Sequence, residues 1–181
     1  MKNVIEFADY YRAQADEQPE NRDLELVDAS PEQLIEIADS INSAVHTATR
    51  VTGRKVARTK VDTLNGNIAG LYNIASNQTF LDHNIAETGD EQLTTHVLTH
   101  EAWHQTNKEE GDNVIITNSN FEEALTETAT SETTGQILAY HEHMPLIDMV
   151  ARQTSTTREK LIELFKEGHN AELNNLYEQA A

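Results

Sequence analysis

Residues 98–105 of this chain read LTHEAWHQ, a segment that contains a complete H-E-x-x-H motif. His100 and His104 are four residues apart, so on a helix they share one face, with Cβ atoms roughly 5–6 Å apart. Their imidazoles can therefore bind the same metal ion. Glu101 lies about 100° around the helix from His100, which keeps its carboxylate off the metal but close to a metal-bound water. This pattern is typical of zinc hydrolases, in which the glutamate is the general base.

The residues before the motif predict that it lies within a helix. Thr88 and Glu91 match a T-x-x-E capping box, which is typical of a helix N-terminus. Leu93, Val97 and Leu98 follow at helical spacing. We therefore expect the motif in the middle of this helix. The alternative is a helix on which the two histidines only pack or cap.

A catalytic zinc site needs a third protein ligand, with water in the fourth position. A metzincin would supply it in H-E-x-x-H-x-x-G-x-x-H, but Asn107 and Glu110 replace the glycine and the third histidine. The sequence therefore disfavours a metzincin. Farther on, Ser119 and Glu122 match a second capping box, which predicts another helix. If Glu122 serves that cap, Glu123 is left for the metal.

With this order of an H-E-x-x-H helix and a glutamate-bearing helix, the chain resembles the gluzincin zinc metallopeptidases, the thermolysin-like group. The resemblance implies a zincin-like fold and zinc ligands His100, His104 and Glu123, with Glu101 as general base. In that family an aspartate four residues after the ligand orients a zinc-bound histidine. Glu127 stands at this position here, so the resemblance implies that role for Glu127.

The resemblance covers roughly residues 66–135 and is greatest to the small, minimal gluzincins. Within it, residues 65–82 predict a β-ribbon, because the Asn-Gly pair at 65–66 signals a type I′ turn and the Ser-Asn pair at 76–77 would turn the chain again. In gluzincins a strand before the active-site helix pairs with the substrate backbone. The resemblance therefore implies that substrate adds a strand here; the alternative is an ordinary small sheet.

Other histidines carry weaker signals. His96, His100 and His104 lie on one face of the helix, but His96 is about 12 Å along the helix axis from His104, too far for one ion to bind all three. We therefore expect His96 to pack or to orient a ligand. Gluzincins often use a downstream His or Tyr to stabilise the oxyanion of the reaction. The nearest candidates are Tyr140, His141 and His143. The alternative for these three is a solvated helix end.

Composition limits the partners. The 181-residue chain has a net charge of −18 and a pI near 4.6, which excludes nucleic acid as the main partner because the phosphate backbone would be repelled. Cationic peptides would be attracted; the alternative is a charge that serves solubility or adaptation to high salt. Five of the 13 basic residues form a cluster that predicts a solvated strand face or a contact for the chain's own acidic surface. They are Arg50, Arg54, Lys55, Arg58 and Lys60.

Cysteine is absent, so disulfides do not support the fold. The N-terminal residues have no apolar signal core, and no apolar run is long enough to cross a bilayer. We expect a cytoplasmic protein with no membrane partner, while a secreted or virion-associated protein stays an open alternative. The sequence does not set the oligomeric state.

The predicted fold class is α+β and zincin-like: a small, mostly antiparallel sheet with the active-site helix, the glutamate helix and flanking N- and C-terminal helices. We expect a single domain over residues 1–181, with an N-terminal helical part (1–53), a catalytic core (54–143) and a C-terminal helical part (144–181). Besides the ribbon and the two site helices, the predicted elements are helices at 4–18, 31–53 (capped by Ser30) and 157–179, a strand at 55–64 and a polar loop at 108–113.

Together these features predict a zinc-dependent metallopeptidase in which Glu101 activates a zinc-bound water for attack on a peptide bond. Two alternatives remain. One is a non-catalytic zinc-binding protein, structural or from a virion, that keeps the zincin fold. The other is a zinc amidase acting on a non-protein amide such as a cell-wall crosslink.

Overall fold

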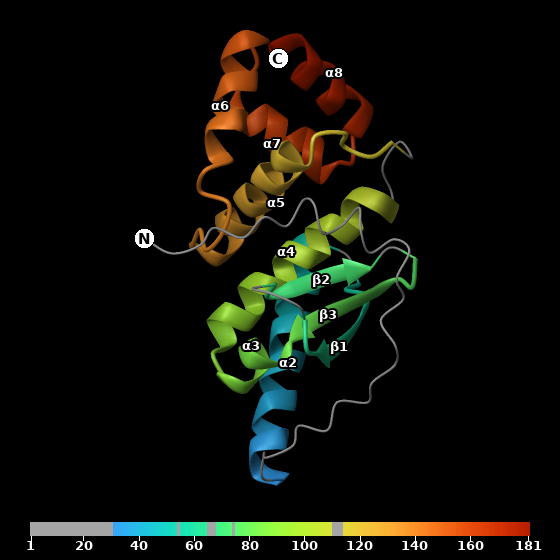
Figure 1. The fold of residues 1–181 in the computed structure, drawn as a ribbon, viewed down its shortest axis with the longest axis vertical. Coiled ribbons are helices and arrows are strands. Elements are labelled where there is room, and N and C mark those ends of the chain that lie inside the picture. The colour runs from blue at the N-terminus through green and yellow to red at the C-terminus, as the bar shows by residue number, and fades with distance from the viewer. Residues whose placement is uncertain (1–30, 54, 65–67, 74, 110–113) are drawn as a thin grey trace. The chain divides into compact units, whose positions relative to one another are not determined.

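The computed structural model describes residues 31–53, 55–64, 68–73, 75–109 and 114–181 (Figure 1). The chain forms two compact units, and the boundary between them falls between Ala102 and Trp103 in the sequence. We call the described residues up to Ala102 the N-terminal unit and those from Trp103 the C-terminal unit. The predicted helix at 4–18 and the Ser30 cap lie outside the described residues. The single-domain expectation stays a prediction.

The N-terminal unit begins with helix α2 (Pro31–Thr52), as predicted. Pro31 occupies the first turn, where its missing N–H costs no helical hydrogen bond. The helix ends before Gly53, whose φ of +69° is the left-handed conformation that commonly terminates helices. Strand β1 (Arg58–Asp62) then forms within the segment predicted to be extended.

The sheet has three strands in the order β1-β3-β2 within the described chain. β2 (Gly70–Asn73) and β3 (Gln78–Asp82) are antiparallel, and the turn between them includes Asn77 at φ 49°, which confirms the predicted turn at 76–77. β1 pairs with β3 in parallel. The predicted mostly antiparallel sheet is therefore wrong in one of its two pairings.

The Asn-Gly pair at 65–66, a predicted type I′ turn, does not lie between two neighbouring strands of this sheet. β1 and β2 lie on opposite sides of β3, and residues 65–67 fall outside the described chain. The connection is instead held by Asp82 at the end of β3. Its Oδ2 accepts a hydrogen bond from Leu64 N–H at 2.9 Å, and its own N–H donates to Ala69 O at 2.9 Å. A short turn signal cannot report such contacts with a later strand.

Two helices follow the sheet. α3 (His83–Glu87), which was not predicted, is capped by Asp82, whose side chain accepts from Asn84 N–H. α4 (Glu91–Glu109) is the predicted H-E-x-x-H helix. Its cap is Asp90, whose Oδ1 accepts from Leu93 N–H at 3.0 Å. The predicted Thr88 cap is therefore wrong, because Thr88 ends α3, where its hydroxyl donates to Ile85 O.

The core of the N-terminal unit is built from α2, β3, α3 and α4. In the same unit, strand β2 approaches α4 closely because residue 70 is glycine. A Cβ on Gly70 would lie 2.5 Å from Val97 Cγ1 and 3.1 Å from Glu101 Cγ. The close packing of β2 on the motif helix therefore requires the absence of a side chain at this position. The buried apolar residues of this core are Ile37, Ala44, Ala48, Val56, Leu81, Ala86, Val97, Leu98 and Ala102.

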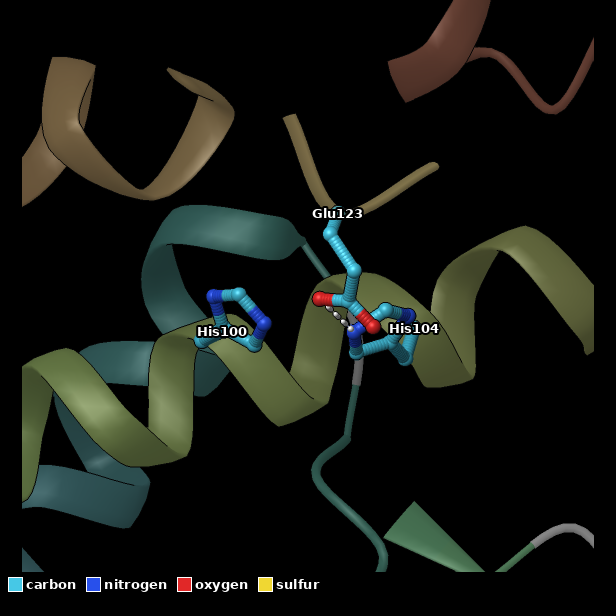
Figure 2. Close-up of side chains that lie close together, drawn as sticks. All are labelled: His100, His104 and Glu123. Atoms are coloured by element: carbon cyan, nitrogen blue, oxygen red, sulfur yellow. Dashed lines mark hydrogen bonds and ion pairs between the residues drawn. The ribbon is translucent and has the colours of Figure 1, made fainter. Parts of the chain in front are cut away.

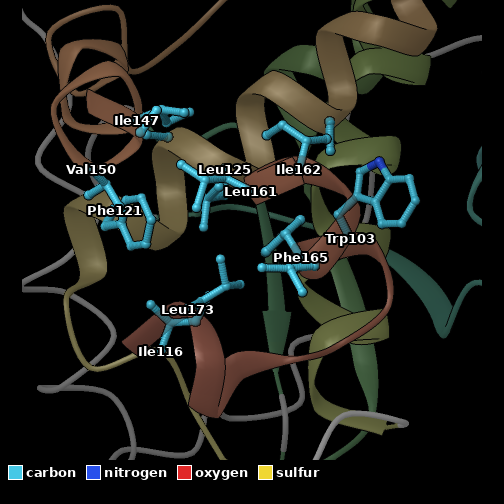
Figure 3. Close-up of a cluster of buried hydrophobic side chains, with 14 residues drawn as sticks. Trp103, Ile116, Phe121, Leu125, Ile147, Val150, Leu161, Ile162, Phe165 and Leu173 are labelled. Atoms are coloured by element: carbon cyan, nitrogen blue, oxygen red, sulfur yellow. The ribbon is translucent and has the colours of Figure 1, made fainter. Parts of the chain in front are cut away.

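The C-terminal unit is helical throughout its described elements. Besides the end of α4, it contains α5 (Ser119–Thr134), α6 (Met144–Gln153), α7 (Arg158–Lys166) and α8 (Asn170–Ala180). Its core gathers Trp103 with apolar residues of all four helices (Figure 3). The largest contributors include Phe121, Leu125, Ile147, Leu161, Phe165 and Leu173.

The predicted single helix at 157–179 is two helices, α7 and α8. Gly168, at φ +74°, ends α7. Its N–H donates to Phe165 O at 3.1 Å, and His169 N–H donates to Leu164 O at 2.9 Å, which together form a Schellman motif. The amphipathic pattern continues across this break because both helices bury one face in the same core. α6, which begins with Met144 and Pro145, was not predicted.

The N-cap of helix α5 is one residue earlier than predicted. Asn118, not Ser119, is the N-cap, and its Oδ1 accepts from Phe121 N–H at 2.9 Å. The segment before it is held by α8: Asn174 accepts from Thr117 N–H at 2.9 Å and donates to Ile115 O at 2.8 Å. The start of the glutamate helix is thus tied to the C-terminal helix, and Glu122 is not needed for the cap.

Asn118→Ala should lower the free energy of unfolding by about 1 kcal/mol, since it removes the acceptor for an N-terminal N–H of α5. Ser119→Ala, the matched control, should change it by less than about 0.5 kcal/mol. Asn118→Asp should retain most of the stability because it keeps the accepting oxygen. Urea unfolding followed by the fluorescence of Trp103, the single tryptophan, measures all three. A loss in Ser119→Ala equal to that in Asn118→Ala would contradict this cap.

Candidate metal centre

Helix α4 carries the motif histidines one turn apart, as the sequence predicted. His100 and His104 are both buried, and Figure 2 shows their rings on the side of the helix where Glu123 lies. His96, one turn before His100, is buried as well. The position of the motif in mid-helix is thus confirmed, since α4 extends from Glu91 to Glu109.

Glu123 from α5 completes a group of three potential ligands. Its Oε2 lies 3.3 Å from His104 Nε2. One ligand atom from each of His100, His104 and Glu123 can be chosen so that all three lie within 4.8 Å of one another. All three side chains are buried. The structure therefore brings together the residues that the sequence predicted, and they could hold a metal ion.

The donor atoms of this group, and the spacing of one pair among them, are compatible with a zinc ion. Two histidines and one glutamate form a donor set found in catalytic zinc sites. Two atoms that are each bonded to a tetrahedral zinc at about 2.0–2.1 Å lie roughly 3.3–3.4 Å apart, and His104 Nε2 and Glu123 Oε2 have this separation. Imidazole and carboxylate groups also bind other divalent transition metals, so the donor set by itself does not name the metal.

Glu122 contacts the other ring nitrogen of His104. Its Oε1 lies 3.3 Å from His104 Nδ1. The expectation that Glu122 serves the helix cap is therefore wrong, because Asn118 is the cap and the Glu122 side chain reaches the His104 ring instead. A carboxylate on Nδ1 fixes the ring and directs Nε2 toward a metal. The available signal was Asn118, a strong N-cap residue directly before Ser119.

The two glutamates control the protonation of His104. Burial by itself would lower the pKa of His104, but the charges of Glu123 and Glu122 and their hydrogen bonds raise that pKa from 6.5 to about 9. Without a metal, His104 is therefore an imidazolium at neutral pH and donates from both ring nitrogens. A metal at Nε2 has to replace that proton.

Glu127 lies one turn after Glu123 on α5 and is fully buried. Its Oε1 accepts hydrogen bonds from Leu138 N–H at 2.7 Å and Ala139 N–H at 3.2 Å. Glu127 therefore holds the loop between α5 and α6 against the glutamate helix. Its expected role in orienting a metal-bound histidine stays a prediction.

Glu101 is buried, and β2 positions its carboxylate. Glu101 Oε2 accepts a hydrogen bond from Tyr72 N–H at 2.7 Å. Successive N–H groups of an antiparallel strand point to alternate sides of the strand. The N–H of Tyr72 is on the side of β2 that does not pair with β3, because it is donated to Glu101. The sequence analysis did not single out Tyr72. Gly70, two residues earlier, is the signal that β2 would come this close to α4.

The predicted oxyanion candidates lie in the turn before α6, not at the end of α5, which stops at Thr134. Tyr140 is buried at φ 54° and stacks on His143, with ring centroids 5.8 Å apart. His143 Nε2 is 3.7 Å from Glu142, and His141 is exposed. A role for Tyr140, His141 or His143 in catalysis stays a prediction.

Comparisons of the chain with protein-family models, with curated proteins and with solved structures found no match. The case for its function therefore depends on its own residues. Among the described helices, none combines the length and the apolar character needed to cross a bilayer.

Glu122→Ala should weaken metal binding roughly 10- to 100-fold, as the loss of a carboxylate behind a ligating histidine does. Glu122→Gln, which keeps an acceptor for Nδ1–H, should lose less. Glu178→Ala, an exposed glutamate on α8, is the control and should bind as the unaltered chain does. Competition against a chromophoric chelator measures the affinities. Equal affinity in Glu122→Ala and Glu178→Ala would contradict the positioning role.

The raised pKa of His104 predicts opposite pH trends with and without metal. The protonated ring stabilises the metal-free fold fully below the unfolded pKa of 6.5, and this contribution is lost as pH rises through about 9. Metal affinity should rise over the same range, because binding displaces the proton. Urea unfolding of the metal-free chain and metal titrations between about pH 6 and about pH 9.5 check both trends. A metal affinity that does not change with pH would contradict the assignment of His104 as a ligand.

Proposed function

We propose that this chain is a zinc-dependent metallopeptidase of gluzincin type. The observation that carries the proposal is the meeting of two histidines from one H-E-x-x-H helix with a glutamate from a second helix, all buried and within 4.8 Å. Structural zinc sites are closed by four protein ligands, whereas catalytic sites use three and leave a position for water. The group found among the described residues has three members.

Buried charge supports a cation in this place. Glu101 of the motif and Glu123 are both nearly inaccessible to solvent, with exposed fractions of 2% and 4%. A carboxylate transferred from water to a protein interior is costly unless it is paired or binds a metal. A divalent cation would offset this negative charge more completely than a single protonated histidine.

When bound at this site, zinc would polarise the substrate carbonyl and acidify water. Glu101 would take a proton from the attacking water on its carboxylate and would give it to the nitrogen of the leaving amine. The hydrogen bond from Tyr72 N–H holds that carboxylate in place during both transfers. Because β2 carries Tyr72, the position of the base depends on the packing of the sheet against α4.

The glutamates divide the remaining work. Glu122 would hold the Nδ1 proton of His104, so that the Nε2 lone pair is directed to the metal. Glu123 would bind the metal directly. Glu127 keeps the loop after α5 in place. For the substrate, the net charge of −18 favours cationic peptides, which it would attract.

A digest of a peptide library with zinc-loaded protein tests this function. The unaltered chain should cleave, and a chelator should stop it. Glu101→Gln should keep zinc but slow hydrolysis by on the order of 10² to 10⁴, because the proton acceptor is lost. Glu123→Ala should lose zinc and activity together. Mass spectrometry locates the cleaved bonds, and the Trp103 fluorescence checks that each variant is folded. Glu178→Gln serves as the control.

The outcomes separate the proposal from its alternatives. Zinc bound without cleavage of any peptide would contradict a peptidase. Crosslinked cell-wall fragments would then be the substrates that test the amidase. If these fragments also stay intact, the non-catalytic zinc-binding protein is the alternative that remains. A Glu101→Gln variant that cleaves at the unaltered rate would show that the base is another residue. Failure of the chain to bind zinc would remove the proposal altogether.

A further inference from the structure

The basic residues of this acidic chain are unevenly distributed. The chain has 13 Lys and Arg against 31 Asp and Glu. No acidic residue lies between Asp39 and Asp62, and this stretch contains five of the basic residues. It covers the second part of α2 and most of β1. A local excess of positive charge therefore lies on the N-terminal unit.

The basic side chains of β1 differ from those of the C-terminal unit in their partners. Arg58 and Lys60 form no ion pair with any residue in the described part of the chain. In the C-terminal unit, three basic residues pair with nearby acids. These pairs are Arg158–Asp148 at 3.5 Å, Lys160–Glu163 at 3.0 Å and Lys166–Glu132. The charges of Arg58 and Lys60 are thus available to an acidic partner.

β1 is also an edge strand. In the described sheet it pairs with β3 on one side, and no described strand pairs with its other side. Such an edge presents backbone N–H and C=O groups that another strand can bind. Arg58 is exposed and the rest of β1 is partly exposed. The outer edge of β1 therefore offers main-chain hydrogen bonds together with positive charge.

The alternation of the strand places the two charges together. Val61 packs against the apolar core of the N-terminal unit. Because successive side chains point to opposite faces, Arg58 and Lys60 share the face opposite to Val61. Asp62, at the end of the strand, accepts from Thr63 N–H at 2.7 Å. A partner strand with acids at alternate positions would meet both Arg58 and Lys60.

The same charges disfavour a second copy of β1 as the occupant. Pairing β1 with itself would bring Lys60 against Lys60 in the antiparallel arrangement centred on Lys60, and also Arg58 against Arg58 in the parallel one, and like charges are destabilising across a strand pair. A nucleic acid is longer than this short strand, so its phosphates would also lie near the rest of the chain, whose net charge of −18 would repel them. A short acidic peptide segment meets neither difficulty.

We propose that β1 is a docking edge for an extended, acidic segment of a partner protein. The segment adds a strand to the sheet through main-chain hydrogen bonds, and its acidic side chains lie opposite Arg58 and Lys60. This inference does not depend on the metal site, because neither β1 nor its partner strand β3 contains a proposed ligand.

Fluorescence anisotropy tests the proposal with the full chain and a short fluorescein-labelled peptide of alternating Thr and Glu. The double variant Arg58→Glu, Lys60→Glu should weaken binding by at least roughly tenfold, since attraction becomes repulsion at both positions. Arg158→Glu, Lys160→Glu is the matched control, with the same residue types at the same spacing in the C-terminal unit. It should bind the peptide as the unaltered chain does.

Probes with the same charge but N-methyl groups on alternate residues, one probe for each register, test strand addition. Both probes carry the same acidic residues. The probe whose methyl groups lie on the amides that pair with β1 should nevertheless lose roughly tenfold in affinity, since those amides cannot donate to the strand. Equal binding by all probes would overturn the proposal in favour of surface charge alone. Binding that survives the Arg58, Lys60 reversal would also overturn it, as would equal displacement of the peptide by a short DNA strand.

Discussion

The imidazole of His104, with one glutamate oxygen near each ring nitrogen, is the interaction on which the candidate metal centre depends. Glu122 and Glu123 are neighbours in the sequence, yet each reaches a different nitrogen at 3.3 Å. The arrangement determines the direction of Nε2 and hence the place of a metal. It also makes the proton and the metal competitors for the same position, because either can offset the charge of Glu123. A metal-free state is therefore stabilised by the proton that metal binding must remove.

Helix α4 has to satisfy more than the metal site. Leu98 and Ala102 belong to the apolar core of the N-terminal unit, and Trp103 belongs to that of the C-terminal unit. The candidate ligands His100 and His104 lie among these core positions in the sequence. Since nearly every side of this helix is buried, a simple division into an apolar and a polar face does not describe it. The polar groups of the motif are tolerated in this environment because other protein groups or a metal satisfy them.

The small sheet serves the proposed function and the proposed docking surface at its two edges. β2 packs on α4 through Gly70, and its Tyr72 N–H holds the carboxylate of Glu101. β1, on the other side of β3, presents Arg58 and Lys60. The strand order therefore separates a buried edge that positions a catalytic candidate from an accessible edge that carries charge. A sheet with β1 beside β2 would not have this separation.

The features that depend on local periodicity could be predicted from the residues alone. The α2 and α4 helices, the turn at 76–77 and the shared face of His100 and His104 follow from spacing within one element. A family resemblance singled out Glu123 as a candidate ligand, and the structure places it beside the two histidines. Three other features became visible only in the folded chain: the parallel pairing of β1 with β3, the hydrogen bond from Tyr72 to Glu101 and the contact of Glu122 with His104. Each of these contacts joins residues that are distant in the sequence. The periodicity of a helix or strand predicts which residues share a face, but not which strand will pair with it or which distant nitrogen a carboxylate will contact.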